Sequence, residues 1–146
     1  MNFIIKEFSS LSTKELFEIY KLRSEVFVVE QNCAYQDVDD KDLSAIHVMM
    51  YDSEILVGYS RILPPSVSYK EPSIGRVVLK KEFRSKGLGK ILMKQTINKT
   101  QELFRNQPIV ISAQTYLLKF YSELSFNSIG DPYLEDDIPH IKMCLP

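Results

Sequence analysis

The chain has 146 residues, of which 45% are hydrophobic and 25% charged, and its formal net charge is −1. This length and composition are typical of one globular domain, so we expect a single unit over residues 1–146. Because 18 basic residues balance 19 acidic ones, no global positive field favours nucleic acid or an anionic membrane as partner. No apolar run approaches the length of a membrane span, and the apolar run at residues 3–5 is too short for a signal peptide.

The two cysteines, Cys33 and Cys144, lie far apart and form no C-x-x-C pair. We expect two free thiols in a reducing compartment, which predicts a cytoplasmic protein. No cluster of residues with the spacing of metal ligands is visible, so no metal site is expected.

The hydrophobic pattern, taken in chain order, predicts a mixed α/β fold. Strands are expected at residues 2–8, 45–51, 54–63, 74–79, 108–113, 127–133 and 138–145. Helices are expected from about residue 12 to 30, from 87 to about 104 and from 115 to 125. The order β-α-β-β-β-α-β-α-β-β places a long helix between two parallel strands.

The first helix begins with a capping box, because Ser12 and Glu15 can each satisfy an otherwise free backbone N–H. Arg23 on the same helix is expected to be a buried cation paired with Asp39 or Asp42. The loop at residues 33–42 is rich in acid, and its ordinary interpretation is a solvated connector.

A strand, a basic glycine-bearing loop and a helix start follow one another at residues 74–93. Free amides at the helix start, the positive end of the helix dipole and two cationic side chains form a cradle for a pyrophosphate. The Walker P-loop is excluded because Arg84 stands at its first glycine and Ile91 follows Lys90. The dinucleotide fingerprint is excluded because Leu92 stands at its third glycine.

The loop instead fits the pattern [Arg/Gln]-x-x-Gly-x-[Gly/Ala], as Arg84-Ser85-Lys86-Gly87-Leu88-Gly89. This resembles the pyrophosphate loop of the GNAT (Gcn5-related N-acetyltransferase) superfamily. The run from Gln114 to Phe126 resembles the second signature of that superfamily, with Phe120 and Tyr121 in register; it departs from the signature at three positions, Gln114, Leu117 and Ser125. Segments 23–47 and 133–141 are similar to the ElaA-type branch.

The resemblance implies a central mixed, mainly antiparallel sheet with one splayed parallel pair, flanked by helices. It also implies a cytoplasmic N-acetyltransferase that uses acetyl-CoA as acyl donor. The residues that it assigns to the cofactor are Val77, Val78, Leu79, Arg84, Ser85, Lys86, Gly87, Leu88, Gly89, Lys90, Gln114 and Tyr121. The strand residues would act through backbone N–H groups freed by a β-bulge.

Catalysis requires a proton donor for the departing CoA thiolate and a base for the attacking amine. The resemblance assigns the first role to Tyr121, for which packing in the core is the ordinary alternative. Candidates for the base, each also open to an ordinary structural role, are Glu30, His47, Asp136 and His140.

The leading expectation is acetylation of a primary amine, carried by a small molecule or a protein, by direct attack on the thioester. Alternatives are transfer from another acyl-CoA or acyl carrier, as in acyl-homoserine-lactone synthases, or a non-catalytic CoA-binding or sensing module. An acidic rim formed by two separate segments is expected to draw the amine toward the site. Its members are Asp37, Asp39, Asp42, Glu135, Asp136 and Asp137. The sequence fixes neither the acceptor nor the oligomeric state.

Overall fold

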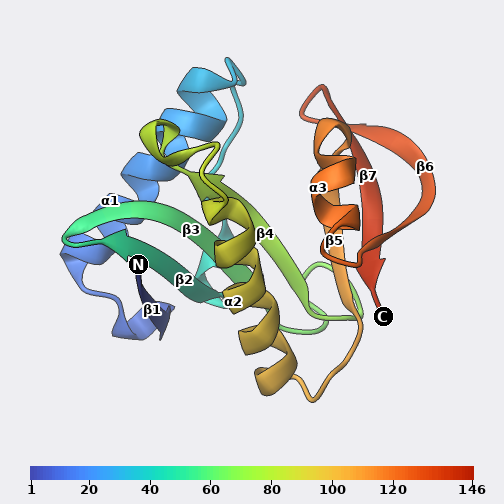
Figure 1. Cartoon of the computed structure of the whole chain (residues 1–146), viewed down its shortest axis with the longest axis horizontal. Helices are drawn as coiled ribbons and strands as arrows, with labels where there is room; N and C mark the ends of the chain where they lie inside the picture. The colour runs from blue at the N-terminus through green and yellow to red at the C-terminus, as the bar shows by residue number, and fades with distance from the viewer.

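The computed structural model describes residues 1–146 and contains one seven-stranded sheet in the order β1-β2-β3-β4-β5-β7-β6 (Figure 1). Its strands are β1 (Asn2–Glu7), β2 (Ile46–Asp52), β3 (Ile55–Leu63), β4 (Ser73–Leu79), β5 (Ile109–Gln114), β6 (Asn127–Glu135) and β7 (Ile138–Leu145). Only β4 and β5 run parallel, and every other neighbouring pair is antiparallel. The mixed, mainly antiparallel sheet expected from the sequence is confirmed.

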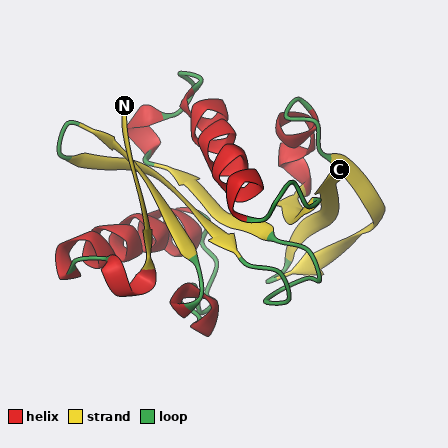
Figure 2. Cartoon of the chain, turned by 90° about the horizontal axis from the view of Figure 1, so that it is seen from below, coloured by secondary structure: helices red, strands yellow, loops and turns green.

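Helices cover both faces of the sheet, as Figure 2 shows from below. They are α1 (Thr13–Arg23), which continues as a π-helix (Ser24–Glu30), α2 (Leu88–Leu103) and α3 (Leu118–Ser122). Short 3₁₀ turns lie at Phe8–Ser10, Asp40–Leu43, Lys81–Phe83 and Thr115–Leu117. One apolar cluster joins α1 to the sheet, and two further clusters lie beneath α2 and α3. No helix has the length and apolarity needed to cross a membrane.

The predicted capping box of α1 is confirmed. Ser12 Oγ accepts from the Glu15 N–H at 3.0 Å, and the Glu15 carboxylate accepts from the Ser12 N–H at 2.8 Å. The helical run ends at Glu30, where the sequence predicted its end, but its last turns are π-helical rather than α-helical. There Gln31 N–H donates to Val26 O, a step of five residues, at 3.1 Å. Such widened turns are frequent at functional sites.

The helix predicted over residues 115–125 is also shorter than expected. A 3₁₀ turn comes first, and α3 ends at Ser122. Phe126 N–H then donates to Tyr121 O at 3.1 Å, around Ser125, which has a φ of 73°. This is a helix end of the Schellman type, a position that glycine normally fills. Ser125 therefore adopts the left-handed conformation in which a side chain is strained.

The parallel pair β4–β5 opens almost at once. Ser73 opposite Val110 is the one register pair between the two strands. On its other side β4 carries a bulge against β3. Tyr59 pairs with Val78 and Arg61 pairs with Gly75, so one residue of β3 lies opposite two residues of β4. Arg76 lies inside this bulge with a φ of 49°. The β5-facing backbone of β4 beyond Ser73 is left without a strand partner, as the family resemblance led us to expect.

Candidate functional site

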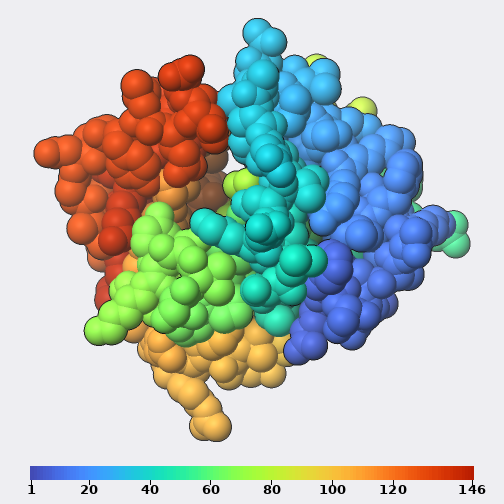
Figure 3. Space-filling view, turned by 180° about the vertical axis from the view of Figure 1, so that it is seen from behind, coloured from blue at the N-terminus to red at the C-terminus, as the bar shows by residue number.

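A cavity of about 280 Å³ lies in the opening between β4 and β5. Figure 3 shows it from behind as a hollow between the C-terminal strands, the chain near residues 60–75 and the chain near residues 35–50. Its walls come from segments far apart in sequence: the π-helix, β3, β4, β5, the 3₁₀ turn before α3 and the β6–β7 hairpin. Strand separation therefore creates a site that passes into the sheet rather than lying on its surface.

Tyr121 borders the inner part of this cavity while being only 7% exposed. Its ring makes edge-to-face contacts with Phe120 and Phe126, at centroid distances of 5.0 and 5.9 Å. The hydroxyl has no hydrogen-bond partner within the protein. Burial, with a smaller contribution from Tyr116, raises the pKa of Tyr121 well above its usual value. The phenol is therefore protonated at neutral pH and able to donate.

Two glutamines line the same cavity as Tyr121. Gln31, at the end of the π-helix, donates through Nε2 to Gln114 Oε1 at the end of β5, at 3.5 Å. Both line the cavity, together with Val77 of β4. Val78 and Leu79 do not line it, and on the other edge of β4 they pair with Tyr59 and Gly58 of β3. Of the predicted cofactor contacts, Val77, Gln114 and Tyr121 thus meet at one cavity.

On the opposite wall, the β6–β7 hairpin presents His140 and Glu135. The hairpin turn consists of Asp136 and Asp137, with φ values of 50° and 62°, which is the geometry of a tight two-residue turn. His140 Nδ1 lies 2.7 Å from the Ile138 carbonyl, an oxygen that can only accept. Nδ1 therefore carries the hydrogen, and in the neutral ring Nε2 has the lone pair.

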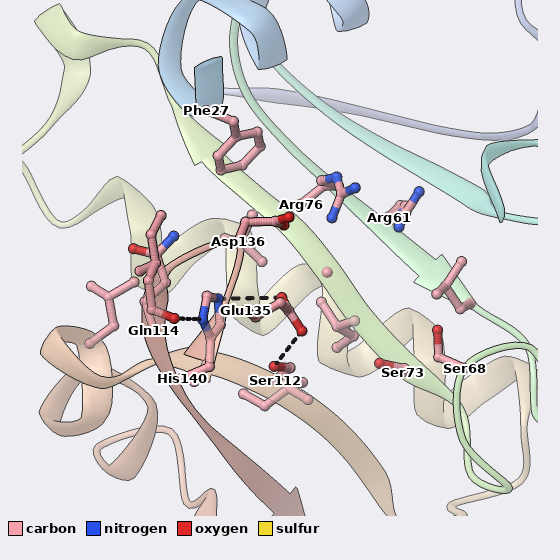
Figure 4. Close-up of a pocket in the computed structure, with 18 of the residues that line it drawn as sticks. Phe27, Arg61, Ser68, Ser73, Arg76, Ser112, Gln114, Glu135, Asp136 and His140 are labelled. Atoms are coloured by element: carbon pink, nitrogen blue, oxygen red, sulfur yellow. Dashed lines mark hydrogen bonds and ion pairs between the residues drawn. The ribbon is translucent and has the colours of Figure 1, made fainter. Parts of the chain in front are cut away.

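That Nε2 faces Glu135 Oε2 at 3.4 Å (Figure 4). In the neutral state of the imidazole both atoms are acceptors, so a donor placed between them would satisfy both. Glu135 Oε1 also accepts from Ser112 Oγ at 3.4 Å, and Ser112 is hydrogen-bonded to Tyr133. The pair is therefore held in place on β6 and β7, and both residues line the cavity.

The predicted phosphate loop leads into α2, outside the cavity. Ser85 and Gly87 have φ values of 62° and 76°, and a Cβ at Gly87 would meet nothing within 4 Å. The helix begins at Leu88, so the first N–H groups of α2 have no partner inside the helix. A Cβ at Gly89 would make an ordinary contact with the Phe120 ring of α3, at 3.4 Å. Open space beside free amides is what a pyrophosphate requires.

Three charged side chains of this loop already have partners. Arg84 binds both oxygens of Glu30, at 2.6 and 3.1 Å, and also donates to the Leu79 carbonyl at 3.2 Å. Hydrogen bonding to Arg84 holds the pKa of the Glu30 carboxyl below its usual range. Lys90 pairs with Glu123 at 2.6 Å, and Lys86 lies 5.4 Å from the Phe83 ring centre.

Glu30, a candidate base from the sequence, does not line the cavity and instead holds Arg84. His47 does not line it either. It is fully buried, with Nδ1 at 2.7 Å from the Tyr59 hydroxyl and Nε2 at 2.9 Å from the Asp42 carbonyl. Of the candidate bases, His140 and Asp136 line the cavity, and only His140 offers a ring nitrogen there.

The acid-rich loop at residues 33–42 does not form a free acidic rim. Of the six acidic residues that were expected to draw the amine toward the site, Asp37, Asp39 and Asp42 are paired with arginines instead. Arg23, completely buried, binds Asp42 at 2.8 Å and Asp37 at 2.9 Å. Pairing of Arg23 with Asp42 is as predicted, whereas Asp39 binds Arg61 at 2.6 Å. Burial acts to raise the pKa of Asp39 and Asp42, but the hydrogen bonds and charges of the arginines together exceed it, so the pKa of both carboxyls is lowered.

Arg76 completes this network, because its Nε lies 2.8 Å from Asp37 Oδ1 and its Nη2 donates to the Asp37 carbonyl at 3.0 Å. Arg61 and Arg76 both line the cavity, and sequence reasoning missed them. The signal was present, since each is a basic residue inside an otherwise apolar strand facing a loop rich in aspartate. A charge can remain buried there only if it is paired.

A family model described as an acetyltransferase (GNAT) domain matches residues 10–145 of this chain. The crystal structure of an acyl-CoA N-acyltransferase from Pseudomonas aeruginosa is similar with a TM-score of 0.94 and 39% identity, covering 99% of both chains. Protein ElaA of Escherichia coli is 37% identical over 137 residues, which is 92% of this chain and 90% of ElaA. The crystal structure of Escherichia coli ElaA matches with a TM-score of 0.92 and 35% identity over 99% of both chains.

A CoA-dependent acyl-homoserine lactone synthase, MesI, shares the fold with a TM-score of 0.77. At 16% identity, over 99% of this chain and 88% of that one, the likeness concerns the fold alone.

Proposed function

The chain belongs to the acetyltransferase (GNAT) domain family, an acyl-CoA-dependent acyltransferase family, and on this premise we propose that it transfers an acetyl group from acetyl-CoA to a primary amine. The observation that carries this proposal is a single cavity at the splayed pair β4–β5. It has a protonated phenol, Tyr121, at one end and the acceptor pair of His140 and Glu135 on the facing wall. Aminolysis of a thioester needs these two kinds of group on the two sides of the carbonyl carbon.

The donor is held by backbone rather than by side chains. Gly87–Lys90, with Arg84, would receive the pyrophosphate at the start of α2, where N–H groups and open space coincide. Unpaired N–H groups of β4 near Val77, with the Gln114 side chain, would bind the pantetheine arm and the thioester oxygen. A donor aimed at such a developing oxyanion contributes roughly 3 kcal/mol. Bound acetyl-CoA supplies the activated acetyl group.

His140 accepts the proton that the ammonium must lose before its nitrogen can attack. Glu135 positions the ammonium by accepting one of its hydrogens, and Nε2 of His140 takes another, because Nδ1 is already committed to the Ile138 carbonyl. As the new C–N bond forms and the C–S bond breaks, Tyr121 donates its hydrogen to the leaving sulfur. The attacking nitrogen then loses its second proton, which the amide product does not keep, and a proton returned through solvent restores the phenol. Burial raises the pKa of Tyr121, and it would raise the pKa of the CoA thiol for the same reason, so in a water-poor site the phenol can protonate the leaving thiolate.

A pair of variants tests the placement of the donor. Asparagine and aspartate both tolerate the left-handed backbone of residue 87, so Gly87→Asn and Gly87→Asp differ in little except charge. We expect calorimetry with acetyl-CoA to show affinity lost by at least tenfold in Gly87→Asp relative to Gly87→Asn. Equal affinities in the two variants would place the pyrophosphate elsewhere.

Turnover is measured as free thiol released from acetyl-CoA in the presence of a panel of amines. Propionyl-CoA and a long-chain acyl-CoA serve as alternative donors in the same assay. We expect acetyl-CoA to give the highest kcat/KM, and a higher value with a longer donor would refute acetyl transfer while leaving acyl transfer standing.

A further inference from the structure

The cavity has two walls of opposite charge that do not pair with each other. Arg61 and Arg76 lie along one side, and Glu135, Asp136 and His140 lie on the other (Figure 4). No ion pair joins the two walls, although both line the same space. An acceptor bound between them would meet hydrogen-bond acceptors at one end and donors at the other.

Arg61 contributes a donor that nothing in the protein uses. Its side chain is only 4% exposed, and its two terminal nitrogens bind Asp39 and Asp42 at 2.6 to 3.1 Å. The third nitrogen, Nε, is buried without a hydrogen-bond partner. Buried donors are rarely left unpaired, because losing the hydrogen bond to water is costly. Arg61 lines the cavity, and this uncompensated N–H lies just beneath the wall, where it adds positive potential that favours an anionic or carbonyl oxygen.

The local charge balance favours an anion. Arg23, Arg61 and Arg76 are matched one for one by Asp37, Asp39 and Asp42, so this network is neutral as a whole. Lys41, which also lines the cavity, has no carboxylate partner.

The Lys41 ammonium donates instead to Ser68 Oγ at 2.8 Å, and Ser68 is itself a lining residue. Lys41 therefore leaves this wall with one positive charge in excess.

We propose, on the basis of the proposed function, that the acceptor is a small molecule that carries a carboxylate as well as the amine, an amino acid or a short peptide. Its ammonium lies between Glu135 and His140, and its carboxylate is bound by Lys41 on the opposite wall, where the unpaired Arg61 Nε–H beneath the surface also attracts it. A polyamine would place its second cation against the arginines. A lysine within a protein would bring no anion to meet them.

Matched acceptors that differ only in the carboxylate test this proposal. The pairs are γ-aminobutyrate with butylamine, L-phenylalanine with phenethylamine, and glycylglycine with glycylglycine amide, each assayed by thiol release with saturating acetyl-CoA. We expect the carboxylate member of at least one pair to have a kcat/KM about tenfold higher or more, the factor that one charge-assisted hydrogen bond typically gives. Calorimetric binding of the corresponding N-acetylated product should show the same preference.

Lys41→Met should reduce this ratio severalfold, and Lys21→Met, an exposed lysine of α1 away from the cavity, is the control. If both members of every pair are acetylated equally well, the inference is wrong and the proposed function stands. A peptide with an internal lysine and an amidated end that outperforms all of these acceptors also overturns it. If no amine releases thiol from a protein that binds acetyl-CoA, the proposed function itself fails, and this inference with it.

Discussion

Replacing Tyr121 by phenylalanine separates proton donation from packing. The phenylalanine ring can keep both edge-to-face contacts, with Phe120 and Phe126, and the hydroxyl that is removed makes no hydrogen bond within the protein. Removing an unpaired, largely buried hydroxyl changes the free energy of unfolding by less than about 1 kcal/mol. For a chain of this length that corresponds to a shift in Tm of no more than about 2–4 °C.

The effect on turnover should be much larger than the effect on stability. Loss of a general acid typically costs about 10²–10⁴ in rate, so kcat for Tyr121→Phe should fall by at least tenfold, with the Kd for acetyl-CoA nearly unchanged. Thiol release under conditions where chemistry limits turnover gives kcat, and calorimetry gives the Kd. Tyr116→Phe is the matched control, because Tyr116 is 72% exposed and does not line the cavity. A Tyr121→Phe protein with near-normal kcat across the pH range would assign this residue to the core alone.

Three further predictions follow from the contacts around the site. Ser125→Gly relieves the left-handed strain after α3 and should raise stability by about 1 kcal/mol, whereas Ser122→Gly inside the helix should lower it, both read from thermal unfolding. Glu30→Gln frees Arg84 and removes a negative charge next to the phosphate loop, so calorimetry should show acetyl-CoA binding up to about fivefold tighter. Binding should be unchanged in the control Glu25→Gln, and weaker binding by Glu30→Gln would contradict the placement of the pyrophosphate at this loop. Burial lowers the pKa of His47, so the unfolded chain binds more protons between its usual value near 6.5 and the lower folded value. Stability should therefore fall as pH decreases below about 7, and the loss between pH 7 and 5 should be smaller in His47→Gln; an identical pH profile in both proteins would count against a neutral buried imidazole.

Much of the fold was predictable because the apolar pattern of this chain is regular. The alternation of Ile141, Met143 and Leu145 with polar neighbours predicted β7, and the Ser12–Glu15 box predicted the start of α1. The π-helical turns at Ser24–Glu30 were not predictable in the same way. The π-helical segment is only seven residues long, which is too short for the apolar pattern to reveal the wider turn.

The site was predictable where it depends on backbone and less so where it depends on long side chains. The loop at Gly87 follows from local spacing and the position of Tyr121 from the family resemblance, and the structure places Tyr121 at the cavity. The partners of Arg61, Arg76 and Glu30 come from segments far away in sequence. Which carboxylate meets which guanidinium depends on how those segments pack, and the sequence pattern does not contain that information.

The most direct test of the account follows the acetyl group itself. Acetyl-CoA labelled in its acetyl group is mixed with the protein, with and without γ-aminobutyrate or butylamine, and the products are identified by mass spectrometry while free thiol is counted. We predict that each thiol released corresponds to one labelled acetyl group on the nitrogen of the amine, with no label retained on the protein. Thiol release at the same rate without an amine, or label that accumulates covalently on the protein before reaching the acceptor, would contradict direct transfer to an amine.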